Sequence, residues 1–179
     1  PKDNIIRAIQ KSEQIQSTNY ENIRYEGFGP HRVACIVETL TDNKNRTASN
    51  IRTLFQKNGG SLGTQGSVSH SFSQIGVIKI DSNEIKENSI YEFVLDIGVD
   101  EFLVKNGYYE IHCKKNDIYK IKKKLEFKVK NFISTEIEWI TSNLISLESE
   151  FEKDVLDFLN ILEDDDDVQK VYANISIKG

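Results

Sequence analysis

The chain has 179 residues, of which 38% are hydrophobic and 28% charged, and its formal net charge is −5. These values are typical of one large or two small globular domains and exclude a disordered or collagen-like chain. No apolar run approaches the roughly 18–20 residues that span a bilayer, so we expect no membrane-spanning role.

The first 80 residues predict a mixture of short strands and helices. The run Val33–Leu40 is dense enough in apolar residues for a central strand buried on both faces. Asn43 is a suitable cap for the amphipathic helix that follows, and Gly59 is a suitable stop. The predicted elements are, in chain order, a helix near residues 3–9, strands 23–28 and 33–40, a helix 47–58, and strands 68–72 and 76–80.

Residues 81–179 continue the same mixture. Alternation indicates the strands, and apolar residues at helical spacing indicate the helices. The predicted elements are a helix 85–97, strands 101–104 and 108–113, a helix 117–126, a strand 133–140, a helix 148–163 and a strand 168–177.

This order predicts an α+β protein in which one domain interrupts another. The outer domain, residues 20–82 plus 147–179, is expected to be a ferredoxin-like split β-α-β-β-α-β domain. A second small α+β domain, residues 83–146, is expected to be inserted into it. The chain has no Met and begins with Pro1, which indicates a processed protein or, as we favour, a piece of a longer one. Residues 1–19 are therefore interpreted as a helical junction from a missing N-terminal domain.

The net charge hides an asymmetry along the chain. Residues 1–80 carry ten Lys and Arg against six Asp and Glu, whereas residues 81–179 carry thirteen against twenty-two. All five arginines lie in the first 52 residues, and the guanidinium group suits phosphate recognition. Residues 105–130 carry nine lysines against three acidic residues. The cluster Lys120–Lys124 is interpreted either as a solvated helix face or as a nucleic-acid contact.

The residues that could carry chemistry do not form a recognisable catalytic or metal-binding set. The three histidines are isolated in sequence, and the two cysteines fit neither a zinc site nor a disulfide framework. We therefore expect reduced thiols, a cytoplasmic location, no metal, no cofactor and no enzymatic activity. The acidic run Glu163–Asp167 is expected to be solvated. The glycine-rich loop Gly59–Gly66 follows a helix rather than opening one, so we expect a tight backbone crossover and not a phosphate cradle.

Arg46 stands out because it lies at the start of a predicted helix, where a positive charge opposes the helix dipole. A bound anion or a carboxylate partner would offset this charge. We expect either an anion or a salt bridge to Glu26 or Glu38.

Three segments together resemble the YebC/PmpR family of regulatory proteins. The opening residues 1–5 and the ending 163–177 are also similar to that family, and the resemblance is weakest across residues 83–146. The three segments are Ile23–Pro30, Leu40–Thr47 and Gly59–Val68.

The resemblance implies a cytoplasmic, non-enzymatic, three-domain protein that regulates transcription by binding DNA. It also implies that the family's helical N-terminal domain is absent from this chain. Some members are described instead as translational activators at the ribosome, so ribosomal RNA is the alternative partner; no membrane or small-molecule substrate is implied. The family commonly has two small residues after the Gly-x-Gly-Pro turn, where this chain has His31 and Arg32. Motif identity and charge together give the candidate nucleic-acid-binding residues Arg24, Arg32, Lys44, Arg46 and Arg52.

Overall fold

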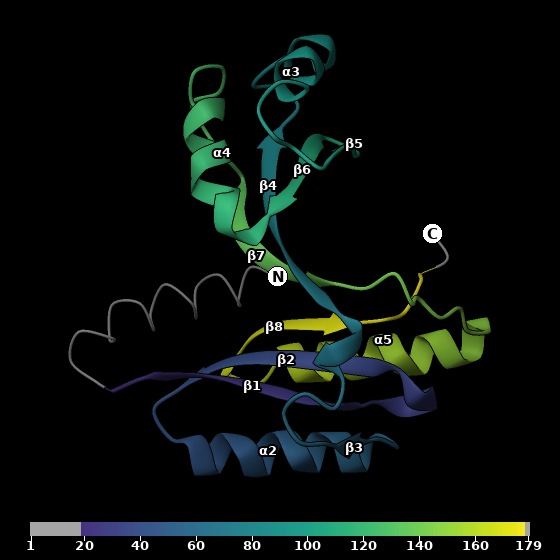
Figure 1. Ribbon diagram of the computed structural model, residues 1–179. Helices are drawn as coiled ribbons and strands as arrows, with labels where there is room; N and C mark the ends of the chain where they lie inside the picture. Colours follow the sequence, from purple (N-terminus) through teal and green to yellow (C-terminus); the bar gives the residue numbers. More distant parts are fainter. Residues whose placement is uncertain (1–18, 178–179) are drawn as a thin grey trace. The chain divides into compact units, whose positions relative to one another are not determined.

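The computed structural model describes residues 19–177, and the helix expected near residues 3–9 lies outside this range. The chain divides into two compact units (Figure 1). The described residues of unit 1 are 19–72 and 141–177, and unit 2 is Ser73–Ile140. The expectation of an α+β chain with a second α+β unit inserted into the first is confirmed.

Unit 1 is built on a four-stranded antiparallel sheet with the order β3-β1-β2-β8. Strand β2 lies between β1 and β8, and Cys35, Ile36 and Val37 in it are fully buried, as the apolar run predicts. The short 3-10 helix η1 (Pro30–Arg32) connects β1 to β2. The four strands are β1 (Glu21–Phe28), β2 (Ala34–Thr41), β3 (Ser61–Leu62) and β8 (Val168–Ala173).

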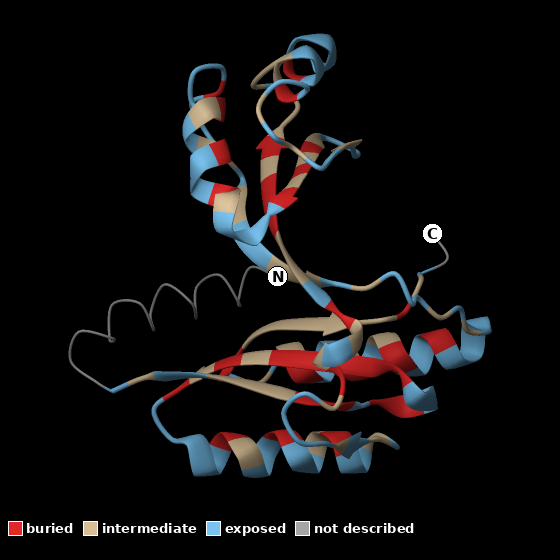
Figure 2. Cartoon of the chain, in the orientation of Figure 1, coloured by how far each residue is buried: buried red, intermediate tan, exposed pale blue. Residues whose placement is uncertain are grey.

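Two helices, α2 (Lys44–Lys57) and α5 (Ser149–Glu163), pack on one face of this sheet. Phe55 of α2 meets Phe158 of α5 edge-on, with ring centroids 5.0 Å apart and an interplanar angle of 80°. Both rings belong to the core that includes Cys35 and Val37 of β2, and the buried positions of both helices are red in Figure 2. Each helix therefore buries one apolar stripe and leaves its opposite face in solvent.

Unit 2 is a second four-stranded antiparallel sheet, with the order β5-β6-β4-β7 and two helices packed against it. Ile78, Ile80 and Ile111 contribute to the core from the strands, and Ile90 and Ile121 contribute from the helices. The elements are β4 (Ser73–Asp81), α3 (Glu87–Val94), β5 (Glu101–Val104), β6 (Tyr108–Lys114), α4 (Ile118–Leu125) and β7 (Ser134–Ile140).

The element order of unit 1 differs from the expected split β-α-β-β-α-β pattern, because it is β-β-α-β-α-β in the described residues. Strand β4 pairs with β6 and β7 and so belongs to unit 2, whereas a boundary after residue 82 would place it in the outer domain. The alternation of β4 indicates a strand, but alternation alone does not identify which sheet the strand joins.

The strand expected over residues 68–72 is wrong. This segment contains the 3-10 turn η2 (Ser69–Ser71), and the strand begins at Ser73. The physical reason lies in the backbone: the N–H groups of Val68 and Ser69 donate to the Glu26 carboxylate, 3.1 and 2.6 Å away, instead of to a neighbouring strand.

Candidate nucleic-acid interface

Helix α2 carries no acidic residue. Its four basic residues are Lys44, Arg46, Arg52 and Lys57. Ile51 and Phe55 are fully buried in the core. At 100° per residue, the side of the helix opposite them carries exposed amide and hydroxyl side chains. The α2 face consists of four such residues and the two basic residues that flank them. The four are Asn45, Ser49, Thr53 and Gln56, and the two basic residues are Arg52 and Lys57.

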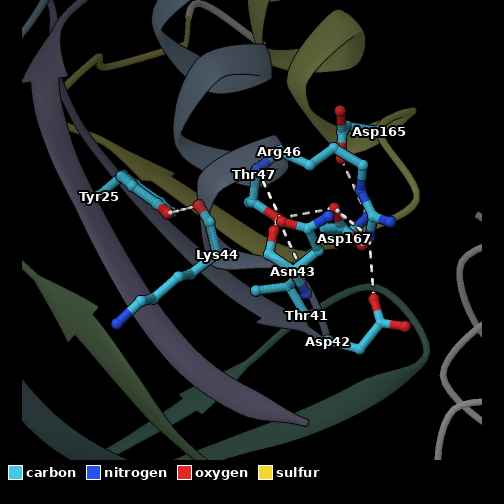
Figure 3. Close-up of polar contacts among 9 residues, drawn as sticks. All are labelled: Tyr25, Thr41, Asp42, Asn43, Lys44, Arg46, Thr47, Asp165 and Asp167. Atoms are coloured by element: carbon cyan, nitrogen blue, oxygen red, sulfur yellow. Dashed lines mark hydrogen bonds and ion pairs between the residues drawn. The ribbon is translucent and has the colours of Figure 1, made fainter.

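The start of α2 is fixed by a polar cluster that reaches across the fold (Figure 3). Asn43 caps the helix, and its Oδ1 accepts a 3.1 Å hydrogen bond from the backbone N of Arg46. The Thr47 hydroxyl donates to Oδ2 of Asp167 at 2.8 Å, and it lies 2.7 Å from the Thr41 hydroxyl. The cluster therefore joins the end of β2, the start of α2 and the residue that precedes β8.

Arg46 is held in this cluster by carboxylates. Its Nη2 lies 3.2 Å from both side-chain oxygens of Asp167 and 3.1 Å from Oδ1 of Asp42. The hydrogen bond and charge of Asp167, and then those of Asp42, raise the pKa of Arg46 above its ordinary value. The expected carboxylate partner is thus present, but it is Asp42 and Asp167 and not Glu26 or Glu38. Asp167 is 5% exposed, which corrects the expectation that the whole acidic run is solvated.

Arg24 is also engaged in an ion pair within unit 1. Its Nε donates to Oε2 of Glu26 at 3.0 Å, and Glu26 also accepts from the backbone N–H groups of Gly66, Val68 and Ser69. Burial of Glu26 opposes its charged form, but these hydrogen bonds outweigh burial and lower the pKa of Glu26 to about 2. Amides of the glycine-rich loop and the turn after it thus bind a carboxylate of the protein itself.

Arg32 lies in the turn between β1 and β2. His31 and Arg32 both adopt left-handed backbone conformations, with φ of 57° and 62°, which suit glycine best. His31 is anchored, because its Nε2 lies 2.8 Å from Oδ2 of Asp154 and its ring stacks on Phe151 at 4.2 Å. The exposed Arg32 lines a surface groove of about 500 Å³ with Phe28, Gly29, His31, Gly59, Gly60 and Ser61.

The five candidate residues therefore fall into two groups. Arg24 and Arg46 are tied to carboxylates. Arg32, Lys44 and Arg52 are exposed, and none of them forms an ion pair with another residue in the described range 19–177. Sequence reasoning missed Lys57, considered Glu26 as a partner of Arg46 although it pairs with Arg24, and took the buried Asp167 to be solvated.

Other kinds of site find no support in the described residues. Among residues 19–177, no group of three or more His, Cys, Asp or Glu side chains is arranged to hold a metal ion. Cys35 and Cys113 are free and buried, and burial raises their pKa values to about 12 and about 11, which disfavours the reactive thiolate. In the part of the chain that the structure describes, no helix is long and apolar enough to cross a membrane.

Comparison with known proteins identifies the family. The family model described as "TACO1/YebC second and third domain" matches residues 20–175. The chain belongs to this family. A probable transcriptional regulatory protein of Pelagibacter ubique is 56% identical over 179 residues, which cover 100% of this chain and 74% of that protein. A protein of the same description from Zymomonas mobilis is 42% identical over 177 residues, covering 99% of this chain and 71% of the relative.

A solved structure is also similar to this chain. The crystal structure of a conserved hypothetical protein from Aquifex aeolicus is similar to this chain with a TM-score of 0.84 and 34% sequence identity. The match covers 100% of this chain and 74% of that one. The similarity to YebC/PmpR proteins noted in the sequence is therefore confirmed as family membership.

Proposed function

We propose that this YebC-family protein is a non-enzymatic transcriptional regulator that binds duplex DNA through the α2 face. The observation that carries the proposal is the composition of α2, a solvent-facing helix with basic residues at both flanks of its exposed side and no acidic residue. Relatives named probable transcriptional regulatory proteins support the same reading. The protein acts without a cofactor, a small-molecule substrate or a membrane.

The dimensions and chemistry of α2 suit a DNA groove. Its 14 residues extend over about 21 Å, and the major groove, about 12 Å wide, admits an α-helix. Arg52 and Lys57 would neutralise phosphates, which provides most of the affinity of such interfaces. Asn45 and Gln56 carry amides of the type that pairs with adenine edges. Lys44 at the start of the helix and Arg32 beside its end extend the basic surface.

Ribosome-associated translational activation is the second candidate function. It would use contacts with ribosomal RNA, whose single-stranded regions are recognised by stacking and phosphate contacts. The lysine- and aromatic-rich surface of α4 favours it.

The proposal is tested with the double variant Arg52→Glu/Lys57→Glu, measured by fluorescence anisotropy on duplex DNA over a range of salt concentrations. The affinity is expected to fall at least about tenfold, and the salt dependence is expected to weaken by a slope of about 2, because two phosphate contacts are lost. Lys105→Glu/Lys153→Glu, at two exposed lysines outside α2, is the charge-matched control. Equal affinities of the two double variants would overturn the assignment of the α2 face. If the α2 double variant keeps its affinity for duplex DNA but no longer co-sediments with ribosomes, ribosome-associated translational activation would be favoured.

A further inference from the structure

Helix α4 in unit 2 exposes two large aromatic side chains among lysines. Tyr119 is 72% exposed and Phe127, in the turn that continues the helix, is 84% exposed. Neither ring stacks on another aromatic side chain within residues 19–177. Two such rings in open solvent are unfavourable for an isolated domain, because each leaves a large apolar area in water.

The two rings and the nearby lysines share one side of α4. Tyr119 and Lys123 are four residues apart on α4, so they lie on one side of the helix. Phe127 comes four residues later, in the turn after the helix ends at Leu125, and the αR backbone of Glu126 and the hydrogen bond from Val129 N–H to the Leu125 carbonyl continue the helical path there, so Phe127 extends the same stripe. Lys120 and Lys124 flank the stripe. The opposite side of the helix, Ile118, Ile121 and Leu125, is buried against the sheet (Figure 2). We call Tyr119, Lys120, Lys123, Lys124 and Phe127 the α4 stripe.

The positive charge of the α4 stripe is not neutralised within the described residues. Lys120, Lys123 and Lys124 form no ion pair with another residue in the range 19–177. Two neighbouring lysines instead lie over aromatic rings at the edge of the core, Lys122 over Phe132 at 5.3 Å and Lys128 over Phe93 at 5.7 Å. Between residues 118 and 130 the chain carries six lysines and a single acidic residue, Glu126.

We propose that the α4 stripe binds single-stranded RNA, with bases stacked on Tyr119 and Phe127 and phosphates paired with Lys120, Lys123 and Lys124. Single-stranded nucleic acid is recognised by this combination of aromatic platforms and a basic track. Phe127 follows Tyr119 by eight residues, and eight residues at helical rise extend over about 12 Å, which leaves room for more than one nucleotide between the stacked bases. A duplex would keep its bases inside the stack and make no use of the rings.

Charge and burial also argue against a lipid surface. An interfacial helix inserts a continuous apolar face into the bilayer, whereas the apolar face of α4 is already occupied by the core of unit 2. What remains exposed is two aromatic rings separated by charged residues. The inference that the α4 stripe binds RNA rests on the proposed function only in that both involve nucleic acid. It concerns a different unit, a different ligand and different residues from the α2 face.

The proposal is tested by anisotropy of a labelled oligouridylate of about twelve nucleotides, a length within the site sizes of single-strand-binding domains. Tyr119→Ala/Phe127→Ala in the full chain is expected to raise the Kd at least about tenfold without changing its salt dependence, because the lysines remain. Tyr119→Phe/Phe127→Trp is expected to retain binding, since both substitutes stack. Tyr91→Ala, at a half-exposed aromatic on the lysine-free helix α3, is the control and is expected to have no effect.

The lysines are tested separately with Lys120→Gln/Lys123→Gln/Lys124→Gln, which is expected to lower the salt dependence of oligouridylate binding by a slope of about 2. Circular dichroism and a thermal transition like that of the parent chain establish that each variant is folded. Unchanged oligouridylate affinity in the folded aromatic variant would overturn the proposal. If that variant also lost binding to phosphatidylserine vesicles, the rings would be assigned to a lipid surface instead. Loss of duplex binding in the α2 double variant, with oligouridylate binding kept, would show that the α4 stripe binds RNA independently of the α2 face.

Discussion

The hydroxyl of Thr47 donates a 2.8 Å hydrogen bond to the carboxylate of Asp167, a residue 120 positions later in the chain. Both side chains are buried, and Arg46 from the same helix turn bonds to the same carboxylate. This contact fixes the first turn of α2 to the segment that enters β8, which follows the inserted unit in the sequence. The orientation of the α2 face therefore depends on a residue that is not part of it.

Removal of Asp167 is expected to destabilise unit 1. Asp167→Ala leaves Thr47 and Arg46 without their shared acceptor, and the expected loss is about 2 kcal/mol of unfolding free energy. The neighbouring exposed residue Asp166 offers the matched control, Asp166→Ala. Urea denaturation followed by circular dichroism measures both. Equal midpoints for the two variants would mean that the Asp167 cluster contributes little to stability.

The two arginines of α2 are expected to respond differently to substitution. Arg46→Ala removes contacts with Asp42 and Asp167 and should lower stability by about 1 kcal/mol, the upper range for partly exposed ion pairs. Arg52→Ala, at an exposed position without a described ion pair, should stay within about 0.5 kcal/mol of the parent chain. Thermal unfolding monitored by circular dichroism distinguishes them. The reverse ranking would assign the structural role to Arg52.

Local signals in the sequence account for most of the individual elements but not for their long-range partners. The apolar run of β2 and the Asn43 cap and Gly59 stop of α2 depend on neighbouring residues, so they could be recognised before the fold was known. The acidic run could not reveal that Asp167 is buried, because its partners Thr47 and Arg46 are more than a hundred residues away. For the same reason, alternation indicated β4 as a strand without showing which sheet it joins.

The candidate site shows the same division. Charge and motif identity led to Arg32, Lys44 and Arg52, which are exposed, but they led equally to Arg24 and Arg46, which bind carboxylates. Composition counts charges and does not show which of them are already paired. The absence of acidic residues from α2 was the available signal for Lys57, since no acidic residue stands three or four positions from Lys57 in the sequence.

Glu26 is expected to make the stability of unit 1 sensitive to acid. Its pKa is about 2 in the folded chain against an ordinary value of 4.5, so its charged form stabilises the fold at pH values above 4.5. This contribution, about 3 kcal/mol, should disappear progressively as the pH falls from 4.5 toward 2. Glu26→Gln should therefore be much less stable than the parent chain at pH 7, and the difference should shrink at pH 3.

The measurement is a series of urea denaturation curves for both chains between pH 7 and pH 3. Glu21→Gln, an exposed position on the same strand, is the control for the general effect of removing one carboxylate. A stability difference between the parent chain and Glu26→Gln that does not change with pH would contradict the prediction. It would then reflect the packing of the amide and not the charge of the carboxylate.

Arg32 is expected to lower the stability of unit 1 while strengthening nucleic-acid binding. Its φ of 62° is costly for a residue with a Cβ, by about 1–2 kcal/mol, so Arg32→Gly should raise the unfolding free energy by about 0.5–1 kcal/mol after the greater freedom of glycine in the unfolded chain is included. The same substitution removes a positive charge from the groove beside Gly59 and should weaken duplex DNA binding and its salt dependence. Arg32→Ala separates the two effects, because it removes the charge and keeps the Cβ. It should weaken binding to the same extent without the gain in stability. A gain in stability with unchanged affinity in Arg32→Gly would restrict the role of Arg32 to the conformation of the turn.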